Sequence, residues 1–418
     1  MKIRSIAYFT QYTHLSAIEE VRVYSPLKTA GLNVIAGIKR DTLNLKGVDQ
    51  ADLILFQRDF AQDLNRYEQI VNYGRSQNKA IVYDIDDLLL FLPETHPDRL
   101  SSNFGPALLP MFQSIIEAGL VTVSTQKLKE TLLSFNSNIT VLPNYLDESI
   151  WQLKNPIKED KKDRPITLGY MGGGSHTPDL EFIVPVLSNL FNRYKNKLQF
   201  IVWGLEPPKA LLRFPQTKWI RVSSYNYRDF AKYFQKQQAD IFIAPLVDNL
   251  FNRCKSAIKF LEYAALGSPC VFSKLDPYKD VIIDGYNGFL ANSDDEWQES
   301  LIRLIENKDL RYELALNAQE TVRENWLLSK NAQKWPAAYQ NVNNIAPVQS
   351  GQAVTFQFPL FKSITQQIFE LSQNQKIERQ SLNHQLQIER QNFDHQLEEQ
   401  DHQLQEQDHQ LQERDQNS

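Results

Sequence analysis

The stretch of residues 240–273 constrains the fold most, because a strand, a loop, a helix and a second strand follow one another without interruption. The runs 240–246 (DIFIAPL) and 269–273 (PCVFS) are short and apolar, which is typical of strands buried on both faces. Residues 256–266 carry apolar side chains at helical spacing, and Gly267 supplies a helix stop. Two buried strands joined by a helix predict a parallel sheet in an α/β fold.

Cationic side chains crowd the predicted start of this helix. Arg253 and Lys255 stand just before it with Ser256, and Lys255, Lys259 and Glu262 follow one stripe of its surface. Cations oppose the positive end of the helix dipole, so helix stability alone does not account for them. A bound diphosphate would account for these cations, because the free backbone N–H groups at the start of the helix point to the same position. The alternative is a solvated basic loop in which Lys259 and Glu262 form a surface ion pair.

A second candidate for phosphate binding is the loop of Gly172, Gly173, Gly174, Ser175 and His176. It lies between a predicted strand and a predicted helix, where glycine lets backbone N–H groups come close to a phosphate. It lacks the Gly-Lys-Ser/Thr ending of a P-loop and the spaced glycines of a dinucleotide-binding fingerprint. A plain flexible turn, with His176 capping the helix, is therefore the alternative.

Three aspartates, Asp84, Asp86 and Asp87, follow the predicted strand 80–83. Asp84 and Asp86 share one face of the extended chain, so binding of a divalent cation is one interpretation. Acceptor binding or proton transfer is the second, and a helix N-cap beside a solvated aspartate is the third. We favour the second interpretation and expect no metal site.

The C-terminal residues 361–418 differ from the rest of the chain in composition. They contain 16 Gln and carry five basic against eleven acidic residues. A seven-residue repeat places Leu397, Leu404 and Leu411 on one stripe. Only one position of each heptad is apolar, so we expect a marginal helix that is either frayed or paired with a partner. The repeated histidines indicate repeat expansion rather than metal binding.

Composition also excludes several classes of protein. Cys254 and Cys270 form neither a disulfide framework nor a metal-ligand spacing, which suits a reducing cytoplasm. The first residues lack the apolar core of a signal peptide, and no apolar run is long enough to span a bilayer. The sequence contains no concentrated basic patch of the kind that nucleic-acid-binding proteins carry, so nucleic-acid binding is not expected. We therefore expect a cytoplasmic protein.

The segment LEYAALGSPCV, residues 261–271, resembles the donor-binding helix LEAxAxGxPV of retaining GT-B-fold glycosyltransferases, which use sugar nucleotides. The longer form FNRxKSxIKxLEYAALGxP, which begins at Phe251, is similar to one subfamily. The resemblance implies that Glu262 holds the ribose hydroxyls and that the residues before the helix bind diphosphate and sugar. The glutamate that the family carries eight residues earlier is replaced by Cys254, so its catalytic role is left unassigned.

Strand and helix signals alternate in two blocks, which predicts two doubly wound sheets, and a polar segment at 154–164 separates them. Residues 324–339 resemble the final crossover helix of GT-B folds, and Pro336 should kink or end it. The resemblance implies two Rossmann-like domains facing a cleft. The expected parts are an acceptor domain (1–155), a donor domain (156–325), a crossover helix (326–343), a linker (344–360) and a Gln-rich helical tail (361–418).

The resemblance implies transfer of a sugar from a nucleotide-sugar substrate to a glycan or lipid-linked acceptor, with retention of configuration and without a metal or other cofactor. The expected site residues are catalytic Lys255, Lys259 and Asp86; donor-binding Gly172, Gly173, Gly174, Ser175, His176, Arg253, Ser256 and Glu262; and acceptor-side Arg22, Arg58 and Asp87. We also expect peripheral association with the inner face of a membrane, and self-association through the tail.

Two other classes of protein stay open as alternatives. A GT-B-like epimerase or phosphorylase would use the same fold and phosphate contacts, although neither an acid/base set nor a cofactor lysine is evident. A non-catalytic scaffold would account for Cys254 and would act through the tail, whereas the presence of Lys259 and Glu262 favours an enzyme.

Overall fold

The computed structural model describes residues 3–11, 16–39, 42–60, 64–99, 104–158, 164–222, 226–340, 342, 373 and 375–391. The chain divides into two units, residues 1–350 and 351–418. In the second unit residues 375–391 are helical, and the three heptad leucines expected on one stripe lie outside the described residues. Among the helices that the structure describes, none combines the length and the apolar character needed to cross a membrane.

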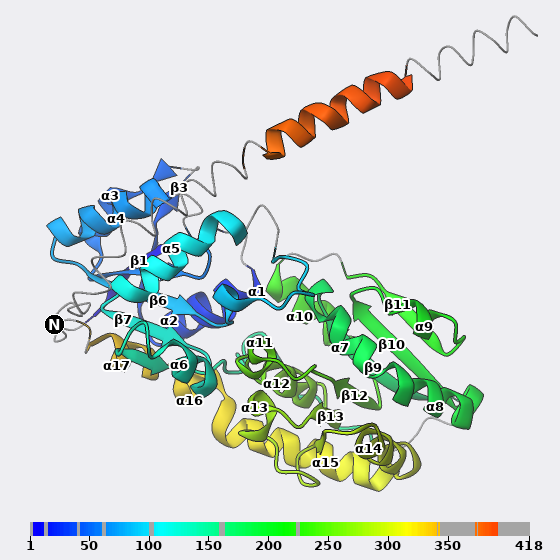
Figure 1. Ribbon diagram of the computed structural model, residues 1–418. Coiled ribbons are helices and arrows are strands. Elements are labelled where there is room, and N and C mark those ends of the chain that lie inside the picture. The colour runs from blue at the N-terminus through cyan, green and yellow to red at the C-terminus, as the bar shows by residue number, and fades with distance from the viewer. Residues whose placement is uncertain are drawn as a thin grey trace, which may run out of the picture. The chain divides into compact units, whose positions relative to one another are not determined.

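The first sheet of unit 1, of which Figure 1 labels β1, β6 and β7, contains six parallel strands in the order β2-β1-β5-β6-β7-β8. The strands are β1 (Ser5–Phe9), β2 (Asn33–Ala36), β5 (Leu53–Gln57), β6 (Ala80–Ile85), β7 (Leu120–Val123) and β8 (Ile139–Val141), with a small antiparallel pair β3 (Ile38–Lys39) and β4 (Thr42–Leu43). Strand β5 is buried on both faces, because Ile54 and Phe56 pack into one apolar cluster and Leu53 and Leu55 into another.

Helices cover both faces of this sheet. They are α1 (Ala17–Glu19), η1 (Glu20–Tyr24), α2 (Ser25–Thr29), α3 (Leu45–Gln50), α4 (Leu64–Ser76), η2 (Leu89–Phe91), α5 (Phe104–Glu117) and α6 (Gln126–Leu132). The predicted helix at 18–30 is present and ends at Gly31, whose φ is 78°. Its middle, η1, is a π-helix, a local widening that is frequent at functional sites.

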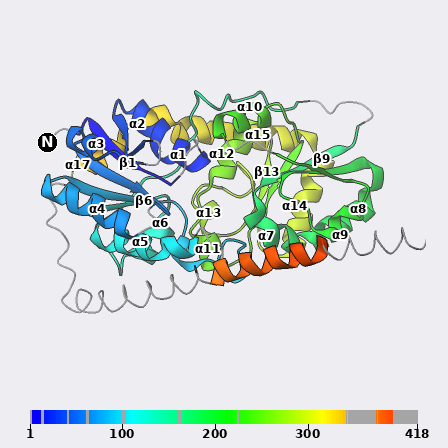
Figure 2. The same ribbon diagram turned by 90° about the horizontal axis from the view of Figure 1, so that it is seen from above.

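The second sheet also has six parallel strands, in the order β11-β10-β9-β12-β13-β14. The strands are β9 (Ile166–Gly172), β10 (Leu198–Gly204), β11 (Thr217–Ile220), β12 (Ile241–Ala244), β13 (Cys270–Ser273) and β14 (Phe289–Ala291). The helices are η3 (Gly174–His176), α7 (Thr177–Phe182), α8 (Val184–Tyr194), η4 (Lys195–Lys197), α9 (Lys209–Leu212), α10 (Tyr227–Phe234), α11 (Leu250–Arg253), α12 (Ile258–Ala265), α13 (Asp276–Lys279), α14 (Asp294–Glu306) and α15 (Lys308–Thr321). Figure 2 shows α10 and α12 on one side of this sheet and α8 and α14 on the other.

The order of these strands fixes where a ligand can enter the second domain. The chain runs outward from β9 through β10 to β11, then returns to place β12 on the other side of β9. At such a reversal the loops after the two central strands diverge and leave a crevice at their carboxyl ends. Here those loops are the glycine loop after β9 and the segment between β12 and α12, the two stretches that the sequence marks as phosphate-binding candidates.

The end of unit 1 returns to the first domain. After η5 (Val322–Trp326) the chain continues as α16 (Leu328–Asn331) and α17 (Lys334–Gln340), whose Trp335 and Tyr339 are buried against the first sheet. The expected single crossover helix is wrong in detail, because Leu327 is extended and interrupts it. Pro336 lies in the first turn of α17, where its missing N–H is tolerated, so it neither kinks nor ends the helix. The two Rossmann-like domains and the crossover confirm the predicted fold class.

Candidate functional site

A cavity of about 210 Å³ lies between the two domains at the strand-order reversal. The second domain contributes His176, Lys255, Ser256, Lys259 and Glu262 to its wall. The first domain contributes Arg22, Asp86, Asp87 and Asn144. Parallel strands end at one edge of each sheet, so side chains that are far apart in the sequence converge where the two edges face each other.

Lys255 and Lys259 bring positive charge to this cavity before any ligand is present. The helix α12 begins at Ile258, two residues later than predicted, and its N-cap Ala257 has no side-chain hydrogen bond. Lys259 is buried, with Nζ 5.3 Å from the centre of the Tyr170 ring. Burial, followed by repulsion from Lys255, lowers the pKa of Lys259 to about 8. A buried ammonium group next to a second cation favours a polyanionic ligand.

His176 is the member of the glycine loop that lines the cavity. Its Nδ1 lies 2.7 Å from Oδ2 of the buried Asp179. The other oxygen of Asp179 accepts hydrogen bonds from the backbone N–H of Val247 and from Asn252. Asp179 therefore ties the loop after β9 to the loop after β12. Burial, together with Lys259 and Lys255, holds the pKa of His176 well below its usual value, so the imidazole is neutral at pH 7.

The glycines of this loop leave space rather than line the cavity. A Cβ atom on Gly173 or Gly174 would meet no atom within 4 Å, and both residues are exposed. Gly172 ends β9, and Ser175 lies within η3. The structure thus places these four predicted donor-binding residues beside His176 without bringing their side chains into the cavity.

Glu262 lies deeper in the second domain and is buried. The hydroxyl of Tyr227 donates to its Oε1 at 3.0 Å, and Trp151 Nε1 donates to the Tyr227 oxygen at 2.9 Å. Burial raises the pKa of Glu262 to about 7, against the opposing influence of Tyr227 and Lys259. The carboxylate can accept hydrogen bonds from a diol, the interaction that the sequence resemblance implies for a ribose.

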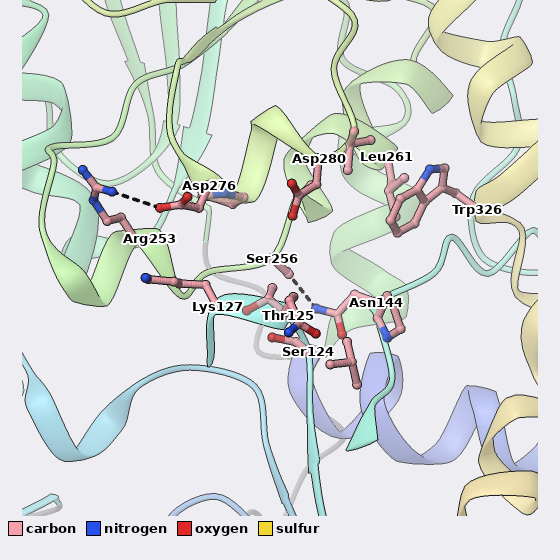
Figure 3. A pocket seen from close by; sticks show the side chains of 16 residues that line it. Ser124, Thr125, Lys127, Asn144, Arg253, Ser256, Leu261, Asp276, Asp280 and Trp326 are labelled. Carbon is pink, nitrogen blue, oxygen red and sulfur yellow. Dashed lines mark hydrogen bonds and ion pairs between the residues drawn. The ribbon is translucent and has the colours of Figure 1, made fainter. Parts of the chain in front are cut away.

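Arg253 does not reach this cavity. It pairs with Asp248 at 2.6 Å and with Asp276 at 3.3 Å, and it lines a second cavity of about 190 Å³ (Figure 3). The two cavities share Asn144 and Ser256, whose side chains are joined by a 2.9 Å hydrogen bond. A donor-binding role for Arg253 therefore has no geometric support, because its charge is already paired on the other side of Ser256.

Cys254 faces away from both cavities. It is fully buried with Phe251 in the apolar cluster of the first domain. Its carbonyl accepts a 2.9 Å hydrogen bond from Thr125, and its sulfur lies 3.6 Å from the hydroxyl of Thr131. The position that resembles the catalytic glutamate of the family thus anchors the α11 segment to the first domain.

Asp86 and Asp87 face the cations of the second domain across the cavity. Arg58 lies 3.5 Å from Asp86 and does not line the cavity itself. Burial raises the pKa of Asp86 to about 6, although Arg58 opposes this shift. For Asp87 burial is outweighed by the cations Lys255 and Arg58, which lower its pKa. Both carboxylates are therefore ionised at neutral pH.

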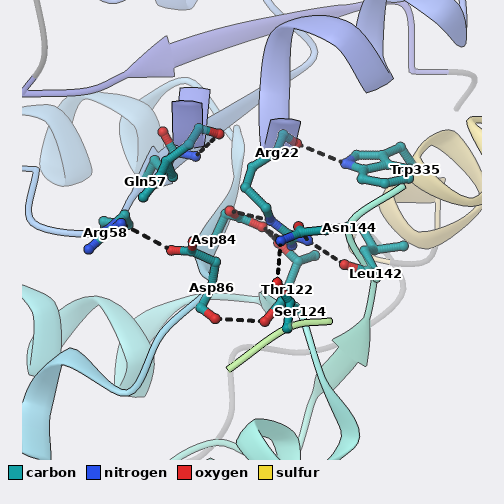
Figure 4. A network of polar contacts seen from close by, with 12 residues as sticks. Arg22, Gln57, Arg58, Asp84, Asp86, Thr122, Ser124, Leu142, Asn144 and Trp335 are labelled. Atoms are coloured by element: carbon teal, nitrogen blue, oxygen red, sulfur yellow. Dashed lines mark hydrogen bonds and ion pairs between the residues drawn. The ribbon is translucent and has the colours of Figure 1, made fainter. Parts of the chain in front are cut away.

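Arg22 lines the cavity but is not available to an acceptor. Its guanidinium donates to both oxygens of Asp84 at 2.7 and 3.2 Å, to Oδ1 of Asn144 at 3.0 Å and to the carbonyl of Leu142 (Figure 4). Neither side chain of the Arg22–Asp84 pair is more than 2% exposed. These contacts favour a positioning role, in which Arg22 holds Asn144 near Ser256, over the expected acceptor-side role, which stays a prediction.

The same network argues against metal binding by Asp84 and Asp86. Thr122 donates to Asp84 at 2.6 Å, so the Asp84 carboxylate is fully engaged by Thr122 and Arg22. Among the described residues, no group of three or more His, Cys, Asp or Glu is arranged to hold a metal ion.

We expect Arg22→Ala to lower the free energy of unfolding by about 3–5 kcal/mol, because it leaves Asp84 buried without its partner. Chemical denaturation measures this loss. Arg75→Ala is the matched control, since the Arg75–Glu117 pair is exposed and its loss is expected to change stability by no more than about 1 kcal/mol. A stable Arg22→Ala protein with only weakened acceptor binding would contradict the positioning role.

Sequence analysis missed three residues that shape the cavity: Asn144, Asp179 and Tyr227. Asn144 is recognisable only as the residue after a Pro that follows a strand, and Asp179 only as an acidic residue in the first turn of α7. Tyr227 carries no local signal, because its role depends on Glu262 and on Trp151, 76 residues away.

Comparisons with known proteins agree with this geometry. Residues 165–307 match the family Glycosyl transferases group 1. Over 202 residues the chain is 28% identical to an uncharacterized glycosyltransferase of Methanocaldococcus jannaschii, a match that covers 47% of this chain and 50% of that protein. The chain thus spans about half the length of this curated relative.

Solved structures show the same fold at low sequence identity. The structure of HepE of Anabaena in complex with UDP and glucose matches with a TM-score of 0.57 at 12% identity. The match covers 81% of this chain and 100% of the HepE chain. Sucrose-phosphate synthase of Thermosynechococcus elongatus has a TM-score of 0.57 at 12% identity, with 82% and 100% covered. These solved structures show that the chain has the GT-B fold.

Proposed function

From the premise that this chain has the GT-B fold and carries a glycosyl transferases group 1 domain, we propose that it transfers a sugar from a nucleoside diphosphate sugar to a hydroxyl of a glycan or lipid-linked acceptor. The observation that carries the proposal is the convergence of His176, Lys255 and Lys259 on one cavity at the strand-order reversal. The HepE structure contains UDP and glucose, which supports a uridine nucleotide as the first donor to test.

In the proposed reaction the second domain stabilises the leaving group. The bond between the sugar C1 and the diphosphate oxygen breaks, and its electron pair stays on the phosphate. Lys255 and Lys259 line the cavity in which this negative charge develops, so they can stabilise it. No cation other than these side chains is required by the proposal, and the nucleotide-sugar is a substrate rather than a cofactor.

In the same proposal the first domain supplies the acceptor side. The acceptor oxygen bonds to C1 and its proton passes towards Asp86, which is buried, ionised at neutral pH and close to Arg58. Asp86 Oδ1 forms an ion pair with Arg58 at 3.5 Å but has no hydrogen-bond partner among the described residues, so an acceptor hydroxyl can donate a hydrogen bond to it. Retention of configuration follows if the acceptor approaches from the face that the diphosphate leaves.

The first test is a thermal-shift titration of the full chain with UDP, GDP and ADP. We expect one nucleotide to raise the unfolding temperature, because a ligand that binds only the folded state stabilises it. Glu262→Ala should abolish the shift, whereas Glu181→Ala, on an exposed position of α7, should retain it. If no nucleotide shifts the wild-type protein, the transferase proposal fails. Membrane association and self-association through residues 361–418 stay predictions.

A further inference from the structure

We propose that Tyr227 is a positioning residue for donor binding, whose hydroxyl holds the Glu262 carboxylate in the orientation and charge state that accept the ribose hydroxyls. This inference rests on the proposed function and deepens it, because it names a residue outside the motif that governs the donor site. Trp151 has the supporting role of holding Tyr227. Neither residue belongs to the loop or the helix that mark the site in the sequence.

The direction of the hydrogen bonds follows from the chemistry of the three groups. An indole N–H can only donate, so Trp151 Nε1 donates to the Tyr227 oxygen at 2.9 Å. Tyr227 has one proton, and Glu262 Oε1 lies 3.0 Å from its oxygen. With one lone pair already engaged by Trp151, the Tyr227 hydroxyl is left to donate to Glu262. The arrangement is thus a one-way chain from Trp151 through Tyr227 to Glu262.

These two hydrogen bonds are strong because they are buried, and they leave one oxygen of the Glu262 carboxylate open. Trp151, Tyr227 and Glu262 are 1%, 7% and 4% exposed. Tyr227 and Glu262 both line the cavity. Among the described residues Tyr227 is the hydrogen-bond partner of Glu262. Because Tyr227 contacts Oε1, the other oxygen, Oε2, remains available to a ligand. A hydrogen bond to a buried charged group is worth more than one at the surface.

The charged and titratable groups around Glu262 decide its protonation state. Tyr227 faces it from α10, Lys259 from its own helix and Tyr278 from α13. Burial raises the pKa of Glu262 to about 7, and the Tyr227 hydrogen bond and Lys259 both oppose the rise. Removing the Tyr227 hydroxyl would therefore raise this pKa further. The neutral acid accepts hydrogen bonds from a diol less well than the carboxylate does.

The first turn of α10 is held from both domains, which fixes the position of Tyr227. Asn226 caps the helix by accepting from the backbone N–H groups of Arg228 and Asp229. Arg228 then reaches the first domain, where it pairs with the buried Glu20 at 2.7 Å. On the inner side of the turn, Tyr227 contacts Trp151, with ring centroids 6.3 Å apart.

Calorimetric titration of the full chain with UDP at a series of pH values tests the inference. Wild-type affinity should fall as the pH drops through about 7, where Glu262 becomes neutral. In Tyr227→Phe we expect about tenfold weaker binding at pH 7 and an acid limb moved to higher pH by about one unit. Tyr233→Phe, on the same helix and partly buried, is the matched control and should behave as wild type.

A second variant keeps the inference testable if Tyr227→Phe does not fold. A 3-fluorotyrosine at position 227 makes the phenol a stronger donor, so the acid limb should move to lower pH. An acid limb that stays in place in both variants would overturn the role of Tyr227 while leaving the proposed function intact. A wild-type protein with no affinity for any nucleoside diphosphate would instead overturn the proposed function, and this inference with it.

Discussion

Lys259→Met is expected to reduce the transfer rate by about a hundredfold or more while leaving the protein as stable as the wild type or more stable. The loss in rate follows because in the proposed reaction Lys259 faces the charge that develops on the leaving diphosphate, and removing one such group typically lowers kcat by about 10²–10³. Methionine retains the unbranched shape of the side chain, so packing against Tyr170 is largely kept.

The expected gain in stability has a definite sign. The folded-state pKa of Lys259 is lowered to about 8, so the unfolded chain binds this proton more tightly than the folded chain does. The folded state is therefore penalised in full below pH 8, and the penalty is relieved as the pH rises from about 8 towards the unfolded-state pKa. At pH 7 methionine removes a penalty on the order of a few kcal/mol.

Steady-state kinetics and chemical denaturation at pH 7 measure the two effects separately. Lys209→Met is the control, because Lys209 is exposed on α9 and does not line the cavity. It should change neither quantity. A Lys259→Met protein that keeps its rate would show that the diphosphate binds elsewhere, and one that loses stability would show that Lys259 has a structural role.

The parts of the fold that could be predicted are those with local signals. Buried apolar runs such as 240–246 identify parallel strands, and Gly267, with a φ of 73°, ends α12 as expected. Once the strands are parallel, the loops after them must meet at one edge. The resemblance to GT-B folds places the glycine loop and the donor helix on the same cleft, and the structure brings Lys255, Lys259 and His176 to one cavity.

The remaining features depend on contacts between distant segments. Arg22 could be recognised as an arginine near the cleft, but its partners Asp84 and Asn144 are 62 and 122 residues away and bury it completely. Arg253 lies two residues before Lys255 in the sequence. The short helix α11 nevertheless directs its side chain towards Asp248 and not into the cavity that Lys255 lines. Spacing identifies which residues share an element, but not which face of that element meets the other domain.

Cys254→Glu, which restores the residue that the family carries at this position, is expected to destabilise the protein rather than improve it. Cys254 is fully buried in the apolar cluster of the first domain, and burial raises the pKa of its thiol, so this environment rejects charge. A carboxylate placed there lowers the free energy of unfolding by about 3 kcal/mol or more, or pulls the α11 segment out of the first domain. Either outcome displaces Lys255, the next residue.

Urea denaturation and donor affinity measured on the same samples show whether Cys254→Glu destabilises the protein or improves it. Cys254→Ala is the control, because it removes the thiol without introducing charge and should lower stability by about 1–2 kcal/mol with little change in donor affinity. If Cys254→Glu were as stable as the wild type and turned over faster, the segment would have to swing into the cavity during the reaction. With the observed packing, position 254 cannot present a carboxylate to the cavity, and the carboxylates that line it from the first domain are Asp86 and Asp87.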